Sequence, residues 1–290
     1  MKDILEKRAA IVRGIRKFFD EQGFVEVETA VRIDAPAPEE HIDCPPVVGG
    51  GYLRASPELQ MKKLLAAGMD KIYQIGPCFR EGERGSRHNP EFTMLEWYRK
   101  GATYLDIKDD LERMFERFER FEKFEILQVR EAYLKYAGWN PWTEWDQDRF
   151  DFDMATKIEP AIKEIGGGVF LIDYPPQAAS LAKISTTSQT SRTSQTSQTF
   201  RVAERWEFYW DGMELANCFT ELCDRDEQLM RFEKAKEARK SLKESDYPLD
   251  YKFIDSLPQI KSAAGIALGI DRLVMILTKA KEISAVRAHI

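Results

Sequence analysis

The sequence predicts an α+β fold in which an antiparallel sheet is flanked by helices. Residues 3–22 repeat apolar side chains at helical spacing, whereas residues 71–98 show the alternation of two strands joined by a charged loop. Asp211 and Gly212 supply a hairpin turn between two further strands. No long structureless linker divides the 290 residues, of which 43% are hydrophobic, so we expect a single domain over residues 1–290 with a substantial core.

Composition excludes several classes of protein. The formal net charge of -6 provides no overall basic field for nucleic acid. The N-terminal segment is amphipathic and charged throughout, so we expect neither a signal peptide nor a membrane-spanning segment there. The four cysteines lack the CxxC spacing of a metal site and indicate reduced thiols in the cytoplasm. They are Cys44, Cys78, Cys218 and Cys223.

The N-terminal third is expected to hold a helix, a strand and a second helix. The first helix covers 3–22 and ends at a glycine, and residues 24–29 have strand character. The apolar face of this first helix consists of Leu5, Ala9, Val12, Ile15 and Phe19. In the second helix Ser56 is a natural N-cap, Pro57 suits the first helical position, and Glu58 suits the positive end of the helix dipole.

The two strands within 71–98 direct successive side chains to opposite faces. The first strand places Arg80 opposite its apolar side chains, and the second groups an aromatic ring, a carboxylate and a phenol on one face. These three residues are Phe92, Glu96 and Tyr98. The loop over 81–90 is dense in charge and carries His88 and Asn89, so it suits a polyanionic ligand. An amphipathic hairpin with a solvated tip would give the same alternation.

The middle of the chain combines further helices and strands. A helix capped by Thr103 carries apolar residues for the core, and a phenylalanine run continues beyond it. These residues are Leu105, Leu111, Met114, Phe115, Phe118 and Phe121. Residues 150–165 are helical but irregular, and 166–176 turn into a buried strand. Ser, Thr and Gln dominate 185–199, so we expect a disordered surface insertion there, or a flap that contacts another protein.

Several segments resemble the motifs of class II aminoacyl-tRNA synthetases. FRxGExGxxHNPEFTMLEWY, over 79–98, is similar to motif 2 as found in lysyl-tRNA synthetases and in their short paralogues, the elongation factor P beta-lysine ligases. GxxLGxDRL, over 265–273, resembles motif 3, and QAASLAKIS, over 177–185, resembles a segment of the ligases. The first helix and strand resemble motif 1, although Ala30 stands where the family usually has proline. The resemblance implies a class II catalytic domain that forms a homodimer.

The resemblance also assigns roles to individual residues. Arg80 and Arg272 are expected to be catalytic, because they would neutralise phosphate charge as ATP and an amino acid form an adenylate. The expected ATP-binding residues are Arg80, Glu83, His88, Asn89, Phe92, Glu214, Leu215, Gly269 and Arg272. The expected amino-acid-binding residues are Ser56, Glu58, Glu96, Tyr98, Asn217 and Glu221. Glu207 and Glu214 are expected to hold Mg²⁺. Glu214 and Asn217 are three residues apart and would point to opposite faces of a regular strand, so a bulge between them is required if both face the site.

Two positions depart from the lysyl-tRNA synthetases. Gly82 stands where those enzymes place a glutamate, and of the flanking Glu81 and Glu83 we expect Glu83 to take over the contact. Ala267 stands where they commonly have glycine, which implies a differently shaped amino acid. The glycines on either side of Ala267 are expected to let the backbone approach the nucleotide closely.

The resemblance implies a ligase that uses ATP and Mg²⁺ to adenylate lysine or (R)-beta-lysine and transfers it to a lysine of elongation factor P. Motif 1 begins almost at Met1, which leaves no room for an anticodon-binding domain, so tRNA is not the expected acceptor. Two alternatives stay open: a truncated synthetase that charges tRNA, and a non-catalytic paralogue that binds an amino acid. The retention of Arg80, Glu214, Glu221 and Arg272 argues against the second alternative.

Overall fold

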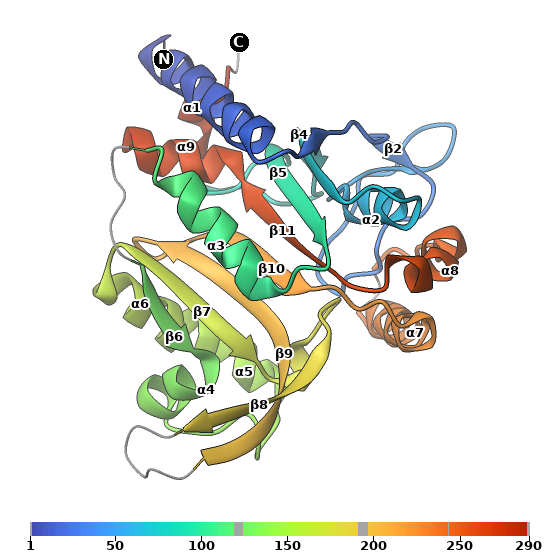
Figure 1. Ribbon diagram of the computed structural model, residues 1–290, viewed down its shortest axis with the longest axis vertical. Coiled ribbons are helices and arrows are strands. Elements are labelled where there is room, and N and C mark those ends of the chain that lie inside the picture. The colour runs from blue at the N-terminus through green and yellow to red at the C-terminus, as the bar shows by residue number, and fades with distance from the viewer. Residues whose placement is uncertain (1, 119–123, 191–196, 243, 289–290) are drawn as a thin grey trace.

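One sheet runs through the computed structural model, which describes residues 2–118, 124–190, 197–242 and 244–288 (Figure 1). Within these residues the sheet has nine strands. Their order is β1 (Val25–Glu26), β4 (Lys71–Phe79), β5 (Glu91–Lys100), β11 (Ala263–Gly269), β10 (Met213–Thr220), β9 (Ser197–Trp210), β7 (Gly168–Tyr174) and β6 (Glu125–Gln128), while β8 (Ile184–Thr190) pairs with β9. All of these pairs are antiparallel except β1–β4 and β6–β7 at the edges. A separate ribbon pairs β2 (Arg32–Ile33) with β3 (Tyr52–Leu53).

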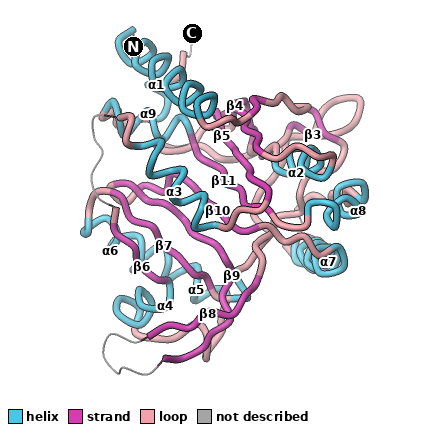
Figure 2. The backbone as a smooth tube through the Cα atoms, in the orientation of Figure 1, coloured by secondary structure: helices cyan, strands magenta, loops and turns pink. Residues whose placement is uncertain are grey.

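Helices flank the sheet in three groups (Figures 1 and 2). Their bounds are α1 (Lys2–Glu21), α2 (Glu58–Ala66), α3 (Tyr104–Phe115), α4 (Val129–Ala132), α5 (Gln147–Asp153), α6 (Glu159–Ile165), α7 (Arg225–Ser241), α8 (Tyr251–Ile260) and α9 (Ile270–Thr278). Helices α1, α3 and α9 share the main hydrophobic core with one face of the sheet. Helices α4, α5 and α6 pack near β6 and β7, and α2, α7 and α8 gather at the opposite end. The predicted α+β class with a largely antiparallel sheet is confirmed.

The period of two along β5 separates the core from the opposite face. Leu95 and Trp97 are buried in the main core, where the ring of Phe19 lies 5.2 Å from that of Trp97. Glu96 and Tyr98 point to the other face, as the alternation predicted. Successive side chains of a strand must diverge in this way because of its pleat. One strand therefore closes the core and supplies a second, polar surface.

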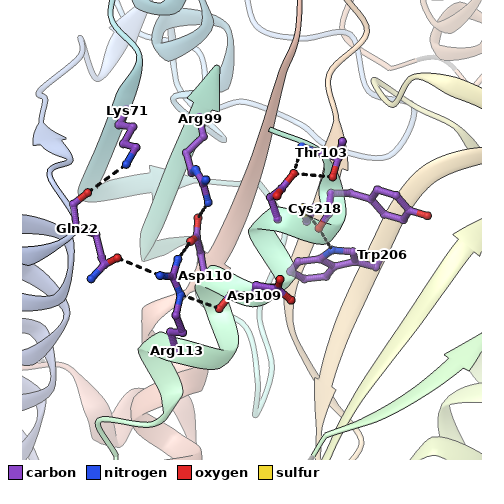
Figure 3. Close-up of polar contacts among 11 residues, drawn as sticks. Gln22, Lys71, Arg99, Thr103, Asp109, Asp110, Arg113, Trp206 and Cys218 are labelled. Atoms are coloured by element: carbon purple, nitrogen blue, oxygen red, sulfur yellow. Dashed lines mark hydrogen bonds and ion pairs between the residues drawn. The ribbon is translucent and has the colours of Figure 1, made fainter. Parts of the chain in front are cut away.

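Helix α3 is held to the sheet by buried and capping contacts (Figure 3). The backbone N–H of Thr103 donates to the carboxylate of Asp106 at 2.7 Å, which forms the capping box at the start of the helix. Asp110 is buried and pairs with Arg99 of β5 at 2.8 Å and with Arg113 of its own helix. Two cations around one buried carboxylate satisfy its charge and fix the helix over the sheet.

The apolar residues predicted for α3 do not all reach the core. Phe115 is fully buried and Phe118 is half-buried against the core, but Leu105 is 44% exposed. The prediction for Leu105 is wrong because its neighbour Tyr104 takes the inward position: the Tyr104 side chain packs against the main core and its hydroxyl donates to Asp173 at 2.7 Å. Phe121 lies outside the described residues.

The first helix is confirmed, with a rotated apolar face and a shorter strand after it. The residues that α1 buries are Ile11, Ile15, Phe18 and Phe19. Ala9, which was expected on this face, is exposed. Gly23 follows the helix with φ +74°, a left-handed conformation that favours glycine. The strand expected over 24–29 is limited to Val25–Glu26, which pairs in parallel with β4.

Helix α2 begins one residue later than the sequence suggests. Pro57 occupies the N-cap position, and Glu58 is the first helical residue. The Ser56 hydroxyl, one position earlier, still accepts the Glu58 N–H at 3.0 Å. Ser56 is therefore not the N-cap that was predicted, although it satisfies one of the free amides of the first turn.

The middle of the chain agrees with prediction in two places. The irregular helix expected over 150–165 consists of α5, a π-helical turn at Met154–Ile158, and α6. Every residue of β7 is buried, as expected for 166–176. The cysteines are free thiols, and Cys223 is the least buried of them. None of the helices in the described part of the chain has the length and hydropathy needed to cross a membrane.

The disorder expected over 185–199 is wrong for the part that the structure describes. Strand β8 continues to Thr190 and pairs with β9 up to Ser197. Backbone groups satisfy each other in such a ladder, and threonine is β-branched, so this polar stretch forms strands although it is too polar to build a core of its own. Residues 191–196 lie outside the described ranges.

Candidate active site

A cavity of about 310 Å³ opens beside β5, β10 and β11, on the face of β5 that carries Glu96 and Tyr98. It gathers every residue predicted for the site except Glu221. The predicted residues that line it are Ser56, Glu58, Arg80, Glu83, His88, Asn89, Phe92, Glu96, Tyr98, Glu207, Glu214, Leu215, Asn217, Gly269 and Arg272. Arg80 and Arg272 come from distant segments and still face the same cavity.

Arg80 lies just beyond β4 at one end of the cavity. Its guanidinium is 5.2 Å from the centre of the Phe92 ring and 3.5 Å from a carboxylate oxygen of Glu83. Arg80 Nε is buried and has no hydrogen-bond partner among the described residues. A buried donor left free beside a cavity is ready for an anionic ligand. Of the two glutamates that flank Gly82, Glu83 lines the cavity, whereas Glu81 is exposed and is absent from its wall.

Arg272 lies in the first turn of α9 and ties the 85–89 segment to β10. It donates to the carbonyl of Glu214 at 2.8 Å, and one guanidinium nitrogen is 2.6 Å from Nε2 of His88. Burial and the charge of Arg272 lower the pKa of His88, so its imidazole is neutral at pH 7. The Nδ2 of Asn89 is buried without a partner within the described residues. This end of the cavity is therefore cationic and rich in donors.

The other end of the cavity is acidic. The hydroxyl of Ser56 donates to Glu96 Oε1 at 2.6 Å, and the hydroxyl of Tyr98 donates to Glu96 Oε2 at 2.8 Å. Burial and the nearby charge of Glu58 raise the pKa of Glu96 to about 7, although both hydrogen bonds oppose that shift. A cationic ligand would stabilise the ionised form of this buried carboxyl and return its pKa toward the ordinary value.

Glu221 is not among the residues that line the cavity, and its role as an amino-acid ligand stays a prediction. Its carboxylate is buried and pairs with the ammonium of Lys62, which also pairs with Glu58. The ring of Phe219, which does line the cavity, lies 5.1 Å from Lys62 Nζ. Burial lowers the pKa of Lys62, but the charges of Glu221 and Glu58 outweigh it and leave that pKa above its ordinary value. The ammonium of Lys62 therefore already neutralises the Glu221 carboxylate.

The central wall is formed by β9 and β10. Glu207 accepts hydrogen bonds from Arg205 at 2.6 Å and from the Tyr209 hydroxyl at 2.7 Å. Arg205 also donates to Asn217 Oδ1 at 3.1 Å. The register of β10 on β9 shifts just after Glu214, which confirms the predicted bulge.

Glu207 and Glu214 lie close enough for their charges to interact. After burial, the charge of Glu207 is the largest cause that raises the pKa of Glu214. No group of three or more potential metal ligands occurs in the part of the chain that the structure describes. Magnesium is commonly held by one or two carboxylates together with substrate phosphates, so this pair of glutamates fits a magnesium ion that arrives with a nucleotide.

The family profile described as "tRNA synthetases class II (D, K and N)" matches residues 1–289. The chain belongs to the class II tRNA synthetase family. Proteins named "Elongation factor P--(R)-beta-lysine ligase" are among its relatives. Those from Yersinia enterocolitica and Vibrio cholerae are 37% and 36% identical to it, over 98% of this chain and 94% of their own length. The one from Mannheimia succiniciproducens is 35% identical over 97% of this chain and 93% of its own.

The sequence analysis missed several residues that lie in the cavity wall or beside it. Arg205 lies on the same strand face as Glu207 and Tyr209, so alternation along β9 could have revealed it. Glu39 lines the cavity from a loop and Lys62 lies in α2, where no pattern in the sequence distinguishes them. Asp271 is buried and accepts the N–H of β5 residue Thr93 at 3.1 Å.

Gly265 and Gly269, the two glycines of strand β11, differ in the space around them. A Cβ on Gly265 would lie 2.1 Å from the Tyr98 ring and 2.7 Å from a carboxylate oxygen of Glu221. Gly265 therefore makes room for Tyr98, and its role in the close approach of a nucleotide stays a prediction. A Cβ on Gly269 would meet Arg272 at 3.8 Å, an ordinary contact distance, so the space above Gly269 is free.

Proposed function

We propose that this chain is an ATP-dependent ligase that adenylates (R)-beta-lysine, or lysine, and transfers it to a lysine side chain of elongation factor P. The polarity of the cavity carries the proposal. Arg80 and Arg272 suit the phosphates of a nucleotide, and Glu96 with its two hydroxyl partners suits the ammonium of a basic amino acid. The names of the relatives, which this chain matches over nearly their whole length, support the same acceptor.

Adenylation needs positioning more than proton transfer. The amino acid's carboxylate is ionised at neutral pH and attacks the α-phosphorus of ATP. A bond forms between a carboxylate oxygen and phosphorus, the bond to the bridging oxygen breaks, and pyrophosphate leaves. The unpaired Nε of Arg80 would bind the reacting phosphate, and Arg272 would neutralise charge from the other segment. Magnesium, held by Glu207 and Glu214, would supply further positive charge to the phosphates.

The cavity also offers groups that suit the adenine base and the amino-acid substrate. Phe92 is half-buried and lines the cavity, so it offers a ring face on which adenine can stack. Ala267 lines the amino-acid end, where its methyl group narrows the space relative to a glycine. We further propose that the chain acts as a single catalytic domain, as a homodimer and in the cytoplasm.

The direct test is the intact mass of elongation factor P after incubation with the protein, ATP, Mg²⁺ and (R)-beta-lysine. We expect a mass increase equal to one β-lysyl group, and its loss in Arg80→Ala. Arg84→Ala is the matched control, because Arg84 is an exposed arginine of the same loop and is absent from the cavity wall. Pyrophosphate exchange without any acylation of elongation factor P, or acylation of tRNA in its place, would contradict the proposal.

A further inference from the structure

A second cavity adjoins the first. Its volume is about 650 Å³, and it extends from β9 toward α5 and α7. The two cavities share a wall at the centre of the site, close to the segment where the amino acid and ATP would react. The shared residues are Glu39, Ser180, Leu181, Arg205, Glu207 and Glu214. A molecule in the second cavity could therefore reach the reacting centre without passing the nucleotide or the substrate ammonium.

The second cavity has more negative charge than its own cations neutralise. Arg205 pairs with Glu207, and Arg231 of α7 pairs with Glu227. Five other carboxylates line the cavity. Glu214 pairs with Arg272, whereas the other four form no ion pair with a cation of the chain within the described ranges. These four are Glu39, Glu40, Asp151 and Glu159, and Lys234 is the remaining cation on the described wall, so carboxylates exceed cations. This excess favours a cationic ligand.

A buried amide provides an independent sign of a ligand. Gln228 of α7 is fully buried and lines the second cavity. Neither its Oε1 nor its Nε2 has a hydrogen-bond partner in the described part of the chain. An unpaired buried polar group costs about 1–3 kcal/mol, so its presence at a cavity wall indicates a partner that arrives from outside.

We propose that the second cavity is the acceptor channel: it receives the lysine side chain of the protein acceptor and directs its amine to the acyl adenylate. The inference rests on the proposed function and identifies where its second substrate enters. The ammonium gives one proton to a carboxylate of the wall. The amine nitrogen then attacks the acyl carbon and an amide bond forms. The bond from the acyl carbon to the phosphate oxygen breaks, and the nitrogen's second proton leaves with the phosphate of the departing AMP.

The test separates transfer from adenylation. Asp151→Lys and Met230→Lys each place a positive charge in the second cavity, at exposed residues that do not line the first. Pyrophosphate exchange with (R)-beta-lysine should stay within about twofold of wild type, because neither residue lines the first cavity. The KM for elongation factor P should rise about tenfold or more, because a cation is repelled. Glu164→Lys on α6 is the control, an exposed reversal outside both cavities.

A second measurement does not depend on the proposed function. Binding of N-α-acetyl-lysine amide to the protein alone is followed by saturation-transfer NMR. We expect binding to wild type and to Glu164→Lys, and its loss in both cavity variants. Unchanged KM for elongation factor P in both variants, or unchanged amine binding, would overturn the assignment of the cavity. If wild type binds the amine but acylates no elongation factor P, the proposed acceptor is wrong while the cavity assignment stands.

Discussion

Replacement of Lys62 by methionine should make the stability of this protein steeply pH-dependent. Lys62 and Glu221 are both buried, with side chains that are 1% and 0% exposed, and they pair directly. Removal of one partner from a buried ion pair typically costs about 3–5 kcal/mol. Glu58, the other carboxylate beside Lys62, retains some contact with solvent and can be hydrated. The loss should therefore fall mainly on Glu221.

The pH dependence follows from the protons that each state binds. In wild type the Lys62–Glu221 pair holds one proton at neutral pH, and the unfolded chain also holds one, on Lys62, so the pair adds no slope. In Lys62→Met the native state must keep Glu221 protonated, because burial raises its pKa, while the unfolded state releases that proton above about pH 4.3. The free energy of unfolding should then fall by about 1.4 kcal/mol per pH unit. Between pH 5 and 8 this amounts to about 4 kcal/mol, which agrees with the cost of a broken pair.

Urea denaturation at several pH values between 5 and 8 measures this slope. The double variant Lys62→Met/Glu221→Gln should recover most of the stability and lose the slope, since no buried charge is left unpaired. Lys240→Met, which removes an exposed i,i+3 partner of Glu237, should change stability by less than about 1 kcal/mol at every pH. If Lys62→Met unfolds at the same urea concentration as wild type over this range, the account of the buried pair is refuted.

Three further predictions concern the cavities. The KM for the basic amino acid should fall about tenfold from pH 6 to 8, because a Glu96 with pKa about 7 ionises over that range, and Glu96→Gln should remove this dependence in pyrophosphate-exchange assays. Gly265→Ala should lower the unfolding midpoint and abolish pyrophosphate exchange, because the added methyl group would collide with Tyr98. Gly269→Ala should leave the midpoint unaltered, and equal midpoints for the two variants would contradict the packing argument. Gln228→Leu should raise the thermal midpoint, because it removes an unpaired buried amide, and should slow acyl transfer; a lower midpoint would show that the amide is satisfied in solution.

Local periodicity predicted one wall of the site well. Phe92, Glu96 and Tyr98 share a face because strand side chains alternate, a property of the backbone that needs no knowledge of the rest of the fold. The same rule showed that Glu214 and Asn217 would point to opposite faces of a regular strand, and the bulge in β10 removes this conflict. Periodicity failed at Leu105, where the helical spacing was right but the direction of the sheet decided which residue faced inward.

The sequence by itself determined the class of the fold and the family, and it predicted many of the residues that line the first cavity, because motifs and alternation are properties of neighbouring residues. Only the tertiary structure decided that Lys62, which is far from Glu221 in the chain, would neutralise it beneath the cavity. It also decided that Arg205 and Glu207 would separate two cavities, and that a Ser/Thr/Gln-rich stretch would continue two paired strands. Each of these depends on which distant segments come into contact, since burial and charge pairing act through space and leave no periodic trace along the chain.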